Sequence, residues 1–96
     1  MKGSIGRQEA ETMAARGLAW IAADTELLGR FLALSGAGPD DLRFRAGEPD
    51  FLGFVLDFLL ADEETLLAFA TAEGIRPELP MRARAALPGG GVPEWT

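Results

Sequence analysis

Two pairs of arginines are the residues of this chain best suited to recognition chemistry. Arg43 and Arg45 form one Arg-x-Arg pair, and Arg82 and Arg84 form a second. Guanidinium groups bind carboxylates and phosphates in a forked geometry, so each pair could contact an anion or a nucleic acid. The alternative is pairing within the protein, because residues 47–75 carry seven acidic side chains and no basic one. The net charge of −6 disfavours nonspecific binding of nucleic acid.

A tryptophan near the end of the chain is the other candidate for recognition. Trp95 follows the breaker Pro88-Gly89-Gly90-Gly91 and has no counterpart elsewhere in the sequence. It either docks into a groove on its own domain or serves as an exposed anchor for a partner, since tryptophan is enriched at interface hot spots. The predicted interaction residues are therefore Arg43, Arg45, Arg82, Arg84 and Trp95.

The side chains that most enzymes use are scarce. Histidine, cysteine and tyrosine are absent, and the only lysine is Lys2. The acidic clusters Asp40-Asp41 and Asp62-Glu63-Glu64 stand at predicted helix starts, where negative charge is stabilising in any case. Neither has the alternating ligands and central glycine of a calcium loop. We expect a protein that is not an enzyme and that has no catalytic residue, metal site or cofactor.

Composition indicates one domain outside the membrane. The chain has 96 residues, 48% of them hydrophobic, which is enough for a single core. Absence of cysteine suits a reducing compartment, and no N-terminal segment has the pattern of a secretory signal. The longest apolar stretch, residues 51–61, contains Asp57 and is too short to span a bilayer. We expect a cytoplasmic protein with no membrane contact.

Apolar periodicity, caps and breakers predict an all-α fold of five to six short helices and no strand. Asp24 and Asp62 are typical N-caps, and Gly36 and Gly74 are typical left-handed helix ends. The predicted helices span about residues 7–22, 25–35, 39–46, 49–60, 63–73 and 80–87. The helix at 49–60 is apolar nearly all round, so we expect it at the centre of a compact array.

Each capped helix also has a predicted inner face. These faces comprise Leu28, Phe31 and Leu32 in one helix and Leu66, Phe69 and Ala70 in the other. Gly17 in the first helix is expected to allow a neighbouring backbone to approach closely. The predicted domain limits are a flexible N-terminus at 1–6, one helical domain at 7–87 and a Gly/Pro-rich tail at 88–96.

The chain also resembles itself at an offset of 38 residues. Eight aligned pairs are identical: Leu18/Leu56, Ala23/Ala61, Asp24/Asp62, Glu26/Glu64, Leu28/Leu66, Phe31/Phe69, Gly36/Gly74 and Pro39/Pro77. Internal duplication is one explanation, and shared rules for capping and ending helices are the other. Both predict two similar halves, which allows a pseudo-twofold arrangement.

Two motifs resemble those of a family of small bacterial proteins of unknown function. The first runs from Pro39 to Leu60 and reads PDDLRxRAGxPxFLxxVLDFLL. The second begins with PMRAR at residues 80–84, continues through LPGG at 87–90 and closes with Trp95-Thr96. The resemblance covers most of the chain from about Ala14. It implies a cytoplasmic bacterial protein, and it brings no activity or site residue with it.

These observations favour a non-enzymatic protein-interaction module, or a small helical protein that associates with itself. The alternative is a domain that binds a small apolar or anionic ligand between its halves, with Phe51, Phe54 and Phe58 lining the pocket. Nucleic-acid binding is the third and least favoured class. The partner is thus predicted to be an unidentified protein or a second copy.

Overall fold

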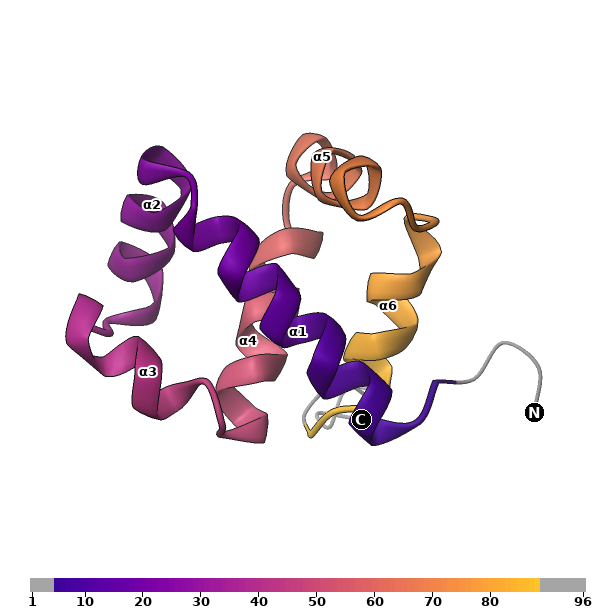
Figure 1. Ribbon diagram of the computed structural model, residues 1–96, viewed down its shortest axis with the longest axis horizontal. Helices are drawn as coiled ribbons and strands as arrows, with labels where there is room; N and C mark the ends of the chain where they lie inside the picture. Colours follow the sequence, from indigo (N-terminus) through magenta and orange to yellow (C-terminus); the bar gives the residue numbers. More distant parts are fainter. Residues whose placement is uncertain (1–4, 89–96) are drawn as a thin grey trace, which may run out of the picture.

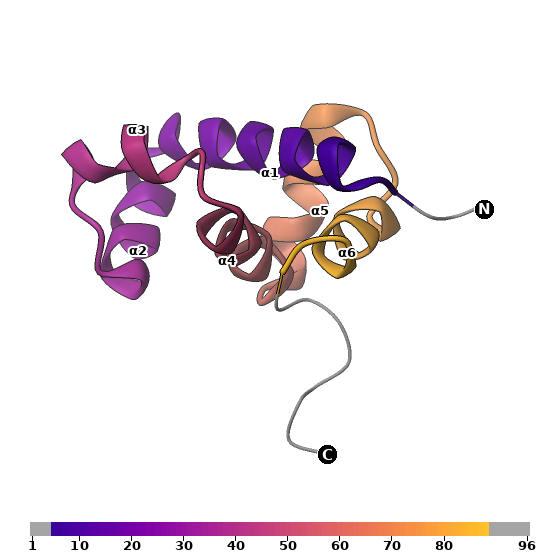
Figure 2. The same ribbon diagram turned by 90° about the horizontal axis from the view of Figure 1, so that it is seen from below.

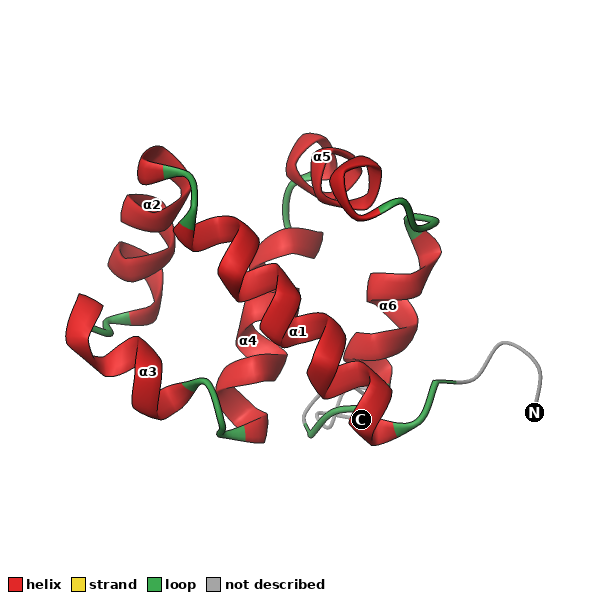
Figure 3. Ribbon diagram, viewed as in Figure 1, coloured by secondary structure: helices red, strands yellow, loops and turns green. Residues whose placement is uncertain are grey.

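Residues 5–88 of the protein fold into six α-helices and one short 3-10 helix. The structure is a computed structural model that describes residues 5–88. The α-helices are α1 (Arg7–Ala22), α2 (Thr25–Ser35), α3 (Leu42–Arg45), α4 (Pro49–Leu60), α5 (Glu63–Glu73) and α6 (Glu78–Ala85), and the 3-10 helix η1 (Pro39–Asp41) leads directly into α3. No strand occurs among these residues (Figure 3), so the predicted all-α class is confirmed.

Helices α1 and α4 cross at the centre of the molecule (Figure 1). α1 packs against α2, α4 and α6, and α4 packs against α1, α5 and α6. Six residues of α4 are buried: Phe51, Leu52, Gly53, Val55, Leu56 and Leu59. The predicted central helix at 49–60 is therefore confirmed, but α1 shares the central position with it. The described part of the chain has no helix long and apolar enough to cross a bilayer.

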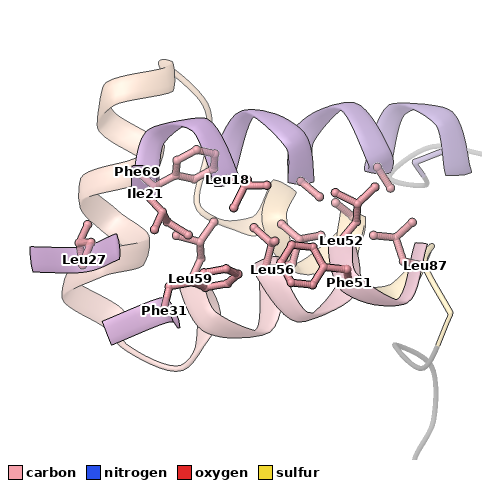
Figure 4. Packing of buried hydrophobic residues seen from close by; sticks show 14 of the residues in the cluster. Leu18, Ile21, Leu27, Phe31, Phe51, Leu52, Leu56, Leu59, Phe69 and Leu87 are labelled. Atoms are coloured by element: carbon pink, nitrogen blue, oxygen red, sulfur yellow. The ribbon is translucent and has the colours of Figure 1, made fainter. Parts of the chain in front are cut away.

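Phe31 is the aromatic centre of the core on the α2 side. It is fully buried, and its ring lies 5.7 Å from that of Phe51, 5.5 Å from Phe54 and 5.3 Å from Phe58. Edge-to-face and tilted contacts of this kind are favourable between aromatic rings. Figure 4 shows Phe31 and Phe51 beside the α4 side chains Leu56 and Leu59. The three phenylalanines of α4 therefore fill space around Phe31.

The predicted helix ends are confirmed in atomic detail. The Asp24 carboxylate accepts hydrogen bonds from the backbone N–H groups of Glu26 and Leu27 at 3.0 and 3.1 Å. Asp62 accepts the backbone N–H of Thr65 at 3.1 Å. Gly36 and Gly74 have φ angles of 76° and 70°, in the left-handed region that side chains disfavour. Each capped helix is thereby stopped 11 residues after it starts.

The buried faces of α2 and α5 differ in part from the predicted inner faces. Leu27 is buried with Phe31, whereas Leu28 and Leu32 are half-buried at the flank of the core. In α5, Thr65 is buried in place of Leu66. Burial costs Thr65 little because its hydroxyl donates a 2.6 Å hydrogen bond to the Asp62 carboxylate.

Two further predictions need correction. Helix α6 begins at Glu78 and ends at Ala85, because Pro80 is tolerated inside the first turn, where its missing N–H has no helical partner. Gly17 is approached by side chains and not by a neighbouring backbone: a Cβ atom there would meet Leu59 Cδ1 at 2.9 Å and Val55 Cγ1 at 3.5 Å. Gly17 thus makes room for the side chains of α4.

The two halves of the chain have the same order of elements. In both views α2 and α3 lie on one side of the central pair, and α5 and α6 lie on the other (Figures 1 and 2). Residues matched by the 38-residue offset have matching roles: Asp24 and Asp62 are caps, and Phe31 and Phe69 are fully buried. The helix contacts of the halves differ, because α6 packs against α1 and α4 whereas α3 packs mainly against η1, so the pseudo-twofold arrangement stays a prediction.

Candidate interaction surface

Arg84 is a structural residue. Its Nε donates to Asp57 Oδ1 at 2.6 Å, its Nη2 donates to Asp57 Oδ2 at 3.1 Å, and its Nη1 donates to the carbonyl of Pro88 at 2.9 Å. Only 15% of the Arg84 side chain is exposed. The guanidinium lies against Gly53, whose missing Cβ would stand 2.9 Å from Nη1. Arg84 therefore ties α6 to α4 and is not free to bind a partner.

Two further acids of the middle segment, Glu48 and Glu73, also pair with arginines. Arg16 Nε lies 2.7 Å from Glu73 Oε1, and Arg45 Nε lies 3.5 Å from Glu48 Oε1. These contacts support the interpretation that the acidic segment 47–75 serves as an internal counterpart for arginines. Arg82 is exposed and forms no ion pair with any residue of the described chain.

Arg43 and Arg45 are the sequence neighbours of an exposed phenylalanine on α3. Phe44 lies between them on α3 and is 78% exposed, the most exposed of the large hydrophobic side chains in the described residues. Arg45 is half-buried, and its Cζ lies 4.8 Å from the centre of the Phe51 ring, a favourable cation–π position. Arg43 is exposed and has no ion pair within residues 5–88.

The short helix α3 cannot bury Phe44. It has four residues and no fully buried side chain, and it packs mainly against η1. Leu42 and Ala46 are its contacts with the core, and both are half-buried. Because these two residues occupy the inner face, Phe44 points away from the core.

A groove lies between α2 and α4, and Arg45 lines part of it. Its volume is about 230 Å³. Leu34 also lines this groove. It is 70% exposed and is thus a second exposed apolar residue besides Phe44. The groove is lined by Leu34, Ser35, Arg45, Asp50, Phe51 and Phe54. We call Leu34, Arg43, Phe44 and Arg45 the α3 surface.

A second groove lies between α1 and α3 and has a volume of about 310 Å³. Six of its lining residues are apolar, and the seventh is Arg43: the lining comprises Ala15, Leu18, Ala19, Ala22, Leu42, Arg43 and Ala46. Leu34 and Arg45 of the α3 surface thus line the first groove, and Arg43 lines the second.

A third hollow, of about 410 Å³, lies near the N-terminal ends of α2 and α5 and is polar. It contains both cap residues, Asp24 and Asp62, together with Arg30. The hydrogen bonds from the hydroxyl and backbone N–H of Thr65 lower the pKa of Asp62 below its ordinary value of 3.8. Within residues 5–88 no three His, Cys, Asp or Glu side chains gather closely enough to hold a metal ion. The carboxylates here have a capping role.

The structure separates residues that looked equivalent in the sequence. Of the predicted interaction residues, Arg43 and Arg45 lie on α3 on either side of Phe44 in the sequence, Arg82 lies on α6, and Arg84 is occupied by Asp57. Trp95 lies outside the described residues. Sequence reasoning missed Phe44 and Leu34. The available signal for Phe44 was its position between two arginines in a segment too short to bury every apolar side chain.

Comparison with known proteins identifies the family. Residues 7–90 match the family described as "Protein of unknown function (DUF3572)". No curated protein and no solved structure matches the chain. Since the match spans most of the sequence, the chain belongs to this family of proteins of unknown function.

Proposed function

We propose that this protein is a non-enzymatic interaction module that binds another protein, or a second copy of itself, through the α3 surface. The observation that carries the proposal is the exposure of Phe44: a phenylalanine is 78% exposed between two arginines, on a helix with no buried residue. Aromatic residues and arginine are enriched at protein interfaces, and hot spots form where they are desolvated together.

Leu34 and Arg45 extend this surface beyond a single side chain. They line the same groove, so an apolar contact at Leu34 and a polar contact at Arg45 are available to one partner.

The test compares Phe44→Ser with a matched control, Met81→Ser. Met81 is 57% exposed on α6, so both changes remove an exposed apolar side chain without disturbing the core. Tagged variants are expressed in the organism that carries the gene, and light scattering follows self-association. We expect partner binding, or dimerisation, to be kept in Met81→Ser and lost in Phe44→Ser. Equal recovery with both variants contradicts the proposal.

A small-molecule site is the second candidate. The α2–α4 groove offers aromatic faces from Phe51 and Phe54 and a cation from Arg45, which suits a small ligand with an apolar body and an anionic group. Its volume of about 230 Å³ is below the roughly 300–1,000 Å³ of typical ligand pockets. Thermal stabilisation by such a ligand, abolished by Arg45→Gln, would favour this function over protein binding.

We also propose that the protein acts in the bacterial cytoplasm. The family resemblance and the absence of cysteine support this location. Cell fractionation of a tagged chain tests it.

A further inference from the structure

We infer that the α1–α3 groove receives an amphipathic α-helix of the partner, and that an acidic residue of this helix pairs with Arg43. The inference rests on the proposed function and adds the kind of partner. The groove is formed by the residues of α1 and α3 given above and contains no acidic side chain.

The shape of the groove suits a helix. Along α1 its wall is made by Ala15, Ala19 and Ala22, which recur at the i, i+4, i+7 spacing of one helix face. All three are exposed, and their small side chains allow another helix to approach closely. Leu18, which is 7% exposed, and the half-buried Leu42 add larger apolar side chains to the lining. Recognition of an apolar helix face by a hydrophobic groove is a recurring binding mode.

In the second half of the chain, the helix that corresponds to α3 is packed against the centre of the fold. Helix α6, the counterpart of α3, packs against both α1 and α4. It buries Pro80 and Ala83, and Leu87 follows as a third buried residue. Helix α3 has half the length and no buried residue, and it leaves the groove open beside α1. The fold therefore packs a helix firmly on one side of its centre and leaves apolar surface uncovered on the other.

Charge supports an acidic partner. Arg43 is the single charged residue of the groove, and it forms no ion pair in the described chain. The groove is locally basic although the molecule as a whole carries a net charge of −6, since Arg43 lines it and no acid does. An arginine that a bound helix partly desolvates contributes more than a fully exposed one.

The described end of the chain lies away from the α1–α3 groove. In Figure 2, α1 and α3 lie along the upper edge, and the end of α6 lies below α1, on the side of α4. The described chain ends at Pro88, which Arg84 holds beside Asp57 and Gly53 of α4. The last described residue, Pro88, therefore lies on the α4 side of α1 and does not line the α1–α3 groove.

A library of helical peptides displayed on phage tests the inference with the full chain as bait. We expect selected peptides to have an apolar face with at least one Asp or Glu. Their affinity is expected to fall by about tenfold or more in Ala19→Trp, which fills the groove, and to be unchanged in Ala72→Trp, an exposed site on α5. Arg43→Glu is expected to weaken acidic peptides by about threefold to tenfold and to favour basic ones. Arg82→Glu is the matched control and should change neither the affinity for acidic peptides nor the preference between acidic and basic ones.

Each other outcome overturns the inference. Absence of selected peptides, equal binding to Ala19→Trp, or an unchanged charge preference in Arg43→Glu each contradicts it. Self-association lost in Ala19→Trp means that a second copy occupies the groove. Tighter peptide binding after removal of residues 89–96 means that the tail occupies it. A natural partner lost with Phe44→Ser but kept with Ala19→Trp leaves the proposed function standing and removes only the helix-binding groove.

Discussion

Arg84 on α6 donates two hydrogen bonds to Asp57 on α4, from Nε to Oδ1 at 2.6 Å and from Nη2 to Oδ2 at 3.1 Å. A third bond, from Nη1 to the Pro88 carbonyl at 2.9 Å, holds the segment that follows α6. Bidentate contacts between arginine and a carboxylate combine charge with fixed geometry, so they are stronger than single exposed ion pairs. This contact orients the last helix on the central one.

Replacing Arg84 with alanine should therefore destabilise the fold. We expect a loss of about 1–2 kcal/mol in the free energy of unfolding, since the bonds are charge-assisted but Asp57 is half exposed. Arg82→Ala, on an exposed position of the same helix, should change stability by less than about 0.5 kcal/mol. Urea denaturation of both variants measures the difference. Equal losses would show that the contact contributes little.

Gly53 should be coupled to the same arginine. Alanine is favoured over glycine inside a helix by about 1 kcal/mol, but a Cβ at position 53 would lie 2.9 Å from Arg84 Nη1. We expect Gly53→Ala to be close to neutral in the wild-type background and to stabilise Arg84→Ala by about 1 kcal/mol. A double-mutant cycle measured by urea denaturation gives the coupling energy. Additive effects would contradict the predicted contact.

Two glycines in the first half should respond in opposite ways to alanine. A Cβ at Gly29 meets nothing within 4 Å, so Gly29→Ala should stabilise the fold by about 0.5–1 kcal/mol. A Cβ at Gly17 would lie 2.9 Å from Leu59 Cδ1, and Leu59 is fully buried. Gly17→Ala should therefore be less stable than wild type by about 1 kcal/mol, because overpacking exceeds the gain in helix propensity. Thermal unfolding distinguishes the two, and stabilisation by both would refute the tight α1–α4 contact.

Stability at acid pH should depend on Asp62. Thr65 hydrogen bonds hold the pKa of Asp62 below its ordinary value in the folded state. The stabilisation is thus fully present above the unfolded pKa of about 4 and is lost as the pH falls through the lowered folded pKa. Asp62→Asn should lower stability at neutral pH, and the difference from wild type should shrink as the pH falls below 3.8. A constant difference across a pH series of urea denaturations would contradict this linkage.

Local signals predicted the elements of this fold well. The caps Asp24 and Asp62 and the glycine ends Gly36 and Gly74 act within one helix turn of their own position, so the helix limits follow from short sequence windows. The extreme apolarity of residues 49–60 likewise predicted burial without knowledge of the neighbouring helices.

Contacts between distant residues were the part that short windows could not supply. The two Arg-x-Arg pairs look alike in the sequence, yet Arg84 meets an acid 27 positions away, whereas Arg43 meets none in the described residues. The exposure of Phe44 depends on Leu42 and Ala46 taking the inner face of a four-residue helix. Burial of Thr65 likewise depends on its bond to Asp62.

The central claim is that a binding partner contacts Phe44. Its most direct test is a photo-crosslinking phenylalanine analogue placed at position 44 in the living cell, with the same analogue at position 81 as the control. Both positions are exposed, so neither substitution should disturb the core. We predict a discrete crosslinked species from position 44, either with another protein or with a second copy, and none of the same mass from position 81. No adduct from position 44, or identical adducts from both positions, would contradict the claim.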